Sequence, residues 1–197
     1  MVIGERFAWA HMPKTAGTAT VEMLRAFDGL VAVADSPDGV DAHVTFADRR
    51  DQVAGKLLVM NLRSLPAWVI SRALYVSRHG VHPDFEPIPM PAAHELAESS
   101  FPDARLALFT DGGSFELDRW LRAESLAEDL IDFVSELRDV DDVERERVRA
   151  VGRLNALDYD HDVSRWFTPA QVERLYGSNP RWAAVEETVY GEVTALA

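Results

Sequence analysis

Lys14, Thr15, Gly17 and Thr18 stand together in the segment 13–18, PKTAGT, where backbone and side chains could hold an anion. The segment lies between a short apolar run and a stretch with helical spacing, and its Pro and Gly predict a turn. A helix that begins after such a turn offers backbone N–H groups and the positive end of its dipole to an anion. We therefore expect a phosphate or phosphosulfate site. An ordinary strand-to-helix turn, with Thr18 as N-cap, is the alternative.

The residue types in this loop suit a phosphosulfate, but their order is not that of a Walker A loop. Lys14 would supply a full charge, the two threonines would supply hydroxyl donors, and Gly17 would let the backbone approach a ligand closely. In a Walker A loop the lysine follows the last glycine directly. Here Lys14 precedes Gly17, which disfavours a generic kinase or NTPase.

Arg63 and Ser71 are candidates for a second anion site. Arg63 follows an apolar run, and Ser71 lies two helical turns after Ser64, so the two serines would share one helix face. Arginine binds phosphate through two parallel N–H donors. A surface arginine at a strand end and a small packing serine are the alternative.

The elements that must position these residues alternate between strand and helix. Continuous apolar runs at 7–12 and 56–62 are typical of buried parallel strands. Further strands are expected at 105–110 and 118–124. We expect helices after the loop and at 64–80, 91–101, 125–138, 140–154 and 167–177, and a proline-rich loop at 81–91. This alternation predicts an α/β fold with three layers, α/β/α, around a central, mostly parallel sheet, and a single domain covering residues 1–197.

Composition narrows the function classes. The chain has 197 residues and a formal net charge of −13, which makes a nucleic-acid partner unexpected because such binding needs a basic surface. The absence of Cys excludes disulfides and thiolate chemistry. No signal peptide or membrane span is expected, so the location predicted is the cytoplasm. His79, His82 and His94 fit no standard ligand spacing, and no metal site is predicted.

Four segments of the chain, taken in their order, resemble segments of the PAPS-dependent sulfotransferases. The chain as a whole resembles a compact, bacterial-type member of that family. AHMPKTAGT resembles the family's 5′-phosphosulfate loop, and NLRSLPAWVIS resembles its 3′-phosphate motif. RWLRAESLAEDLIDF and RWFTPAQVERLYG resemble a later strand-to-helix segment and the C-terminal helix. The resemblance implies a P-loop-like sulfotransferase fold, with 3′-phosphoadenosine-5′-phosphosulfate (PAPS) as cofactor and adenosine 3′,5′-bisphosphate as product.

The resemblance also implies roles for individual residues. Lys14 matches the lysine that stabilises charge on the leaving phosphate. The residues that match the phosphosulfate cradle are Thr15, Ala16, Gly17, Thr18 and Ala19. Arg63 and Ser71 match the ligands of the 3′-phosphate, and Arg153 and Asn155 lie where many members carry a loop that closes over the cofactor.

A base must take the proton of the acceptor. DAHVTF resembles a segment that carries a histidine base in several carbohydrate sulfotransferases, which makes His43 the first candidate, with an unperturbed pKa near 6.5. Glu22, one turn into the helix after the loop, is the second. A histidine without catalytic role and a solvated helix carboxylate are the respective alternatives.

The expected activity is transfer of a sulfonate to a hydroxyl or amine of a carbohydrate or small-molecule acceptor, with a homodimer left open. Leu65 and Trp68 depart from the family, whose members often have Pro and Arg at those positions. This departure keeps a second hypothesis open, a non-catalytic module that binds a nucleotide or a protein on the same fold. The acceptor itself does not follow from the sequence, because variable loops build such pockets.

Overall fold

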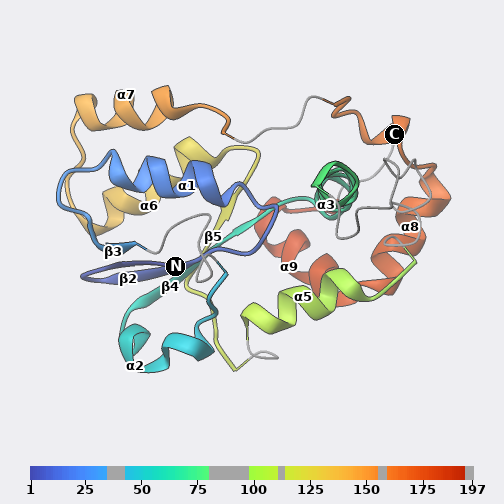
Figure 1. The fold of residues 1–197 in the computed structure, drawn as a ribbon, viewed down its shortest axis with the longest axis horizontal. Coiled ribbons are helices and arrows are strands. Elements are labelled where there is room, and N and C mark those ends of the chain that lie inside the picture. The colour runs from blue at the N-terminus through green and yellow to red at the C-terminus, as the bar shows by residue number, and fades with distance from the viewer. Residues whose placement is uncertain (35–42, 80–97, 111–113, 155–158, 194–197) are drawn as a thin grey trace. The chain divides into compact units, whose positions relative to one another are not determined.

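The computed structural model describes residues 1–34, 43–79, 98–110, 114–154 and 159–193 (Figure 1). These residues form two compact units, and the chain passes from one to the other three times. The first unit comprises residues 1–62 and 107–156, and the second comprises residues 63–106 and 157–197.

The first unit is built on a five-stranded sheet with the order β3-β1-β2-β4-β5. Its strands are β1 (Val2–Gly4), β2 (Phe7–Ala10), β3 (Val31–Ala34), β4 (Leu57–Leu62) and β5 (Arg119–Arg122). β2 and β5 pair in parallel with β4, whereas β1 pairs antiparallel with both β2 and β3. Four strands therefore point one way, which confirms the expected α/β class and mostly parallel sheet.

Three helices pack together on one side of this sheet (Figure 1): α1 (Gly17–Arg25), α6 (Leu126–Leu137) and α7 (Asp142–Val151). Side chains alternate along the strands, so Phe7 and Trp9 join a core with residues of α1 and α6. Phe133 of α6 meets Phe7 edge-on at a ring distance of 5.6 Å. A short turn, η1 (Ala47–Arg49), and α2 (Arg50–Val53) precede β4.

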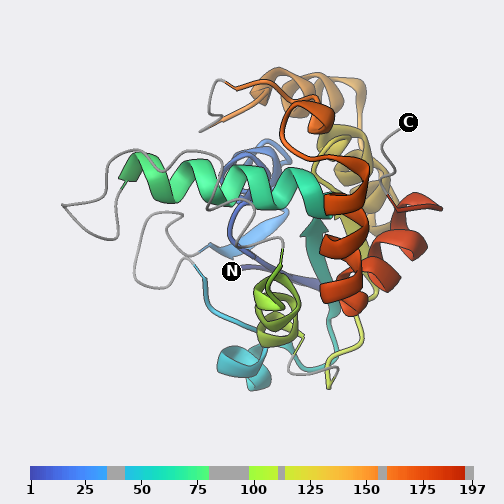
Figure 2. The ribbon, with the colours of Figure 1, turned by 90° about the vertical axis from the view of Figure 1, so that its right-hand side faces the viewer.

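The second unit is helical in the residues described. It contains α3 (Leu65–His79), η3 (Val163–Arg165), α8 (Pro169–Ser178), α9 (Pro180–Tyr190) and most of α5 (Phe101–Phe109). α3 contacts both α8 and α9 (Figure 2). The ring of Trp68 in α3 lies 5.1 Å from that of Trp182 in α9 and 6.2 Å from that of Phe101 in α5.

Several sequence predictions were wrong in detail. All but the last residue of the run 105–110 belongs to helix α5 rather than to a strand, because Pro102 and Asp103 supply helix-start signals that an apolar run alone does not outweigh. The helix expected at 167–177 is α8, which begins two residues later, at Pro169, and ends at Ser178.

Other predictions fall outside the described part of the chain: the loop at 81–91, and the helix at 91–101 except for its last residues. Among the residues that are described, no helix has the length and apolar character needed to cross a bilayer.

Candidate functional site

The loop between β2 and α1 has an unusual backbone. Lys14 and Ala16 have φ values of 69° and 68°, in the left-handed region that non-glycine residues seldom adopt. Ala16 is the N-cap of α1, and no side chain caps the helix there. Successive N–H groups in a turn that alternates between left- and right-handed residues form a concavity that suits an anion. The turn capped by Thr18, the alternative considered from the sequence, is therefore not the one observed.

Thr15 has a structural part in this loop. Its side chain is fully buried, and its hydroxyl donates to the carbonyl oxygen of Met12 at 2.7 Å. That donor is used inside the loop, whereas Thr18 is partly exposed. Thr15 therefore contributes to the loop through its backbone, and Thr18 is the threonine of the loop whose side chain is exposed in part.

Gly17 is required for a reason that the sequence did not reveal. A Cβ atom at this position would overlap the ring of His11. His11 is buried, and its ring stacks on that of Trp9 at 5.6 Å and 19°. The glycine therefore makes room for a buried imidazole, whereas the sequence had suggested that it makes room for a ligand.

Asn61 of β4 binds the loop, and it was not singled out from the sequence. It is fully buried near the end of β4, and its amide nitrogen donates to the carbonyl oxygen of Thr15 at 2.7 Å and to the hydroxyl of Thr20 at 2.6 Å. Its amide oxygen accepts from Trp9 Nε1 at 2.8 Å. The signal that could have found it is the single polar residue in the apolar run LLVMNL.

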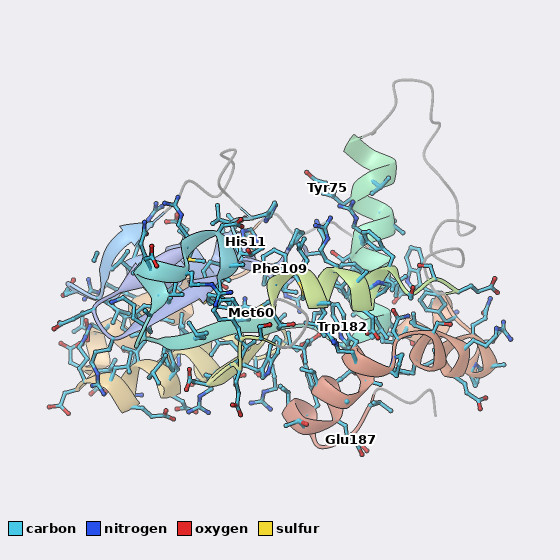
Figure 3. All side chains as sticks on the ribbon, turned by 90° about the horizontal axis from the view of Figure 1, so that it is seen from below. His11, Met60, Tyr75, Phe109, Trp182 and Glu187 are labelled. Carbon is cyan, nitrogen blue, oxygen red and sulfur yellow. The ribbon has the colours of Figure 1, made fainter. Side chains whose placement is uncertain are left out.

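His43 is exposed and contacts the buried His11. The two rings meet edge-on, with centroids 4.7 Å apart. Its Nδ1 is 3.1 Å from the carbonyl oxygen of His11. A carbonyl can only accept, so this contact places the hydrogen of the neutral ring on Nδ1 and leaves Nε2 as the proton acceptor. His11, the residue that His43 contacts, is labelled in Figure 3 among the side chains of the first unit.

Glu22 is held by a neighbour on its own helix. Its carboxylate accepts from Arg25 at 2.6 Å, and both side chains are more than 40% exposed. This arrangement matches the solvated helix carboxylate that was the alternative to a catalytic role.

Arg63 and Ser71 belong to the second unit. Ser71 is buried within α3, and the carbonyl oxygen of Arg63 accepts from Trp182 Nε1 at 3.2 Å. The first amide of α3, that of Leu65, donates to the buried carboxylate of Glu186 at 2.8 Å. The chain's own carboxylate thus occupies part of this helix N-terminus.

Arg72 is a further cation of the second unit that sequence reasoning missed. Burial and the nearby charge of Arg105 lower the pKa of Arg72. Two cations in a partly dry environment would gain from a bound anion.

Of the pair assigned to a closing loop, Arg153 is exposed after α7, and Asn155 lies outside the described residues.

Within the described ranges, no group of three or more His, Asp or Glu side chains is arranged to hold a metal ion. Comparison with known proteins gave no match to a family model, to a curated protein or to a solved structure.

Proposed function

We propose that this protein is a sulfotransferase that uses PAPS as its sulfonate donor, on a three-layer fold of the sulfotransferase type. The observation that carries the proposal is the left-handed loop at Lys14 and Ala16, which leads from the carboxyl end of β2 into α1 without a side-chain cap. Ligands of α/β sheets bind at this end of the strands. The donor set, a lysine, a threonine hydroxyl and helix amides, suits a doubly charged phosphosulfate.

In this proposal the loop of the first unit holds the 5′ end of the nucleotide. The amides of Ala16, Gly17 and Ala19 and the hydroxyl of Thr18 would bind its oxygens. The Lys14 ammonium would neutralise charge on the phosphate oxygen from which the sulfonate departs. Thr15 would support the loop without offering its hydroxyl, because Met12 already accepts that hydrogen. When bound, PAPS supplies the sulfonate.

His43 is the proposed base. The contact with the His11 carbonyl orients the ring so that Nε2 can take a proton from the acceptor hydroxyl or amine. His43 is exposed, and so an acceptor of open shape, such as a carbohydrate or another small molecule, could reach it. Glu22 is the weaker candidate, since Arg25 already binds its carboxylate.

The cofactor class is tested by calorimetric titration with adenosine 3′,5′-bisphosphate and with ADP. We expect the first nucleotide to bind more tightly and to raise the melting temperature more, because ADP lacks the 3′-phosphate that Arg63 and Ser71 would hold. Arg63→Ala should remove most of the difference between the two nucleotides. Equal binding of ADP to the unmodified protein would reject the assignment.

A non-catalytic module that binds a nucleotide or a protein is the second candidate. Two observations favour it: the burial of Ser71, and the Glu186 carboxylate on the first amide of α3. Both weaken the case for a 3′-phosphate beside α3. Conversion of PAPS to adenosine 3′,5′-bisphosphate in the presence of a panel of hydroxyl and amine acceptors separates an enzyme from such a module.

A further inference from the structure

The direction of two peptide groups decides what the loop can present to a ligand. The carbonyl oxygen of Thr15 points into the buried layer, where it accepts from Asn61 at 2.7 Å. In a planar trans peptide the N–H group points opposite to the carbonyl. The N–H of Ala16 therefore points away from the buried layer.

The next peptide group is fixed in a similar way. The carbonyl oxygen of Ala16 accepts from the backbone nitrogen of Thr20 at 3.0 Å and from its hydroxyl at 3.1 Å. This carbonyl points along α1, so the N–H of Gly17 points out beyond the start of the helix. Asn61 reaches this peptide as well, because it donates to the same Thr20 hydroxyl.

The backbone does not favour this arrangement by itself. Left-handed conformations, such as those of Lys14 and Ala16, are unfavourable for residues that carry a Cβ atom. Such strain persists only where surrounding contacts over-determine the conformation. From β4, Asn61 supplies two such contacts, to the Thr15 carbonyl and to the Thr20 hydroxyl.

We propose that Asn61 is the positioning residue of the anion loop, and that it turns the Ala16 and Gly17 amides outward as a donor pair. The inference rests on the proposed function in so far as the loop is an anion site, and it does not require sulfonate transfer. An amide side chain is the group that fits, since the position needs two N–H donors and one acceptor on a short stem. Aspartate has the same shape but no donor, and it would place a carboxylate against the Thr15 carbonyl.

The test uses inorganic diphosphate as probe, with Asn61→Asp as the variant and Trp9→Phe as the matched control. Trp9→Phe removes one hydrogen bond of the same buried cluster and leaves the bond between Asn61 and Thr15 in place. Calorimetry gives the affinity, and amide chemical shifts of Ala16 and Gly17 locate the bound probe. We expect Asn61→Asp to weaken diphosphate binding about 10- to 100-fold, as for hydrogen bonds to a charged group.

The control separates positioning from general loss of stability. Trp9→Phe should melt at a lower temperature yet bind diphosphate nearly as well as the unmodified protein. If Asn61→Asp does not fold, Asn61→Ser, which keeps a short polar side chain, takes its place with the same expectation.

Three results would overturn the proposal. They are unchanged affinity in the Asn61 variant, an equal loss of affinity in Trp9→Phe, and no shift of the two amides when diphosphate is added to the unmodified protein. A protein that binds diphosphate as expected but never consumes PAPS would reject the sulfotransferase function and leave the role of Asn61 standing.

Discussion

The imidazole ring of His11 fills the space that a Cβ atom on Gly17 would need. The same histidine offers its carbonyl oxygen to Nδ1 of His43, so one buried residue lies between the start of α1 and the proposed base. Packing at His11 therefore links two parts of the candidate site that the sequence separates.

Gly17→Ala should destabilise the protein by about 1–3 kcal/mol, the usual cost of overfilling a packed interior. In a His11→Ala background the ring is gone. The same glycine substitution should then be neutral, or should stabilise by up to about 1 kcal/mol, because alanine is the better helix former. Chemical denaturation of both single variants and the double variant measures the coupling. Additive effects would show that the ring does not set the requirement for glycine.

Lys14→Ala should lower the rate of sulfonate transfer by about 10²–10³, by analogy with loss of one donor to a developing oxyanion. Binding of adenosine 3′,5′-bisphosphate should change less, since the lysine acts best on charge that develops during transfer. Lys14→Gly is the matched control, because it also removes the ammonium but accepts the left-handed backbone at φ 69°. It should be as slow as Lys14→Ala while melting at a higher temperature. Near-normal turnover in both variants would mean that the ammonium has no part in the reaction.

His43→Ala should abolish most transfer and leave nucleotide affinity intact. Only the neutral imidazole accepts a proton, so in the unmodified enzyme the rate should rise with pH through the titration of His43. Initial rates across this pH range provide the measurement. Glu22→Gln serves as control and should remain active, because the Glu22 carboxylate is exposed and bound to Arg25. The reverse pattern, with Glu22→Gln inactive and His43→Ala active, would move the role of base to α1.

Glu144 should make stability depend on pH in acid. Hydrogen bonds from Arg138 lower the pKa of Glu144 from 4.5 to about 2. A carboxyl with a lower pKa in the folded state stabilises the fold when ionised, and this contribution is lost as the pH falls from about 4.5 toward about 2. Glu144→Gln should flatten that part of the stability curve, followed by urea unfolding at successive pH values.

Glu128→Gln is the control for Glu144. Glu128 also pairs with an arginine, Arg149, but the side chain is 57% exposed, and exposed pairs contribute little. Equal effects of the two substitutions would contradict the special position of Glu144.

Strong local signals predicted much of the fold. The continuous apolar runs became β2 and β4, and α8 begins at Pro169, with Thr168 as its N-cap in a full capping box. β1 and β3 were missed because segments of three and four residues are too short to show a period. α9 was missed because its apolar residues form only a weak stripe on one face.

The candidate site was predictable where residue type alone carries the chemistry. Lys14 and the glycine turn were recognised in this way. The sequence did not reveal the roles of Asn61 and His11, or that Thr15 uses its hydroxyl inside the loop. These roles depend on contacts of β2 and the loop with β4, which is distant in sequence. The single polar residue in the run LLVMNL marks Asn61 as unusual, but its partners follow from tertiary packing and no local pattern encodes them.

The sheet is not contiguous in the chain. β4 ends at Leu62 and β5 begins at Arg119, with much of the second unit encoded between them. At ribosomal speeds of about 5–20 residues per second, roughly 3 to 12 seconds pass between the synthesis of β4 and that of β5. During that interval Asn61 has been synthesised. Helices α6 and α7, whose residues complete the core on one side of the sheet, have not. Until β5 has been synthesised, the backbone N–H and C=O groups along this edge of β4 therefore lack the strand that pairs with them in the folded protein.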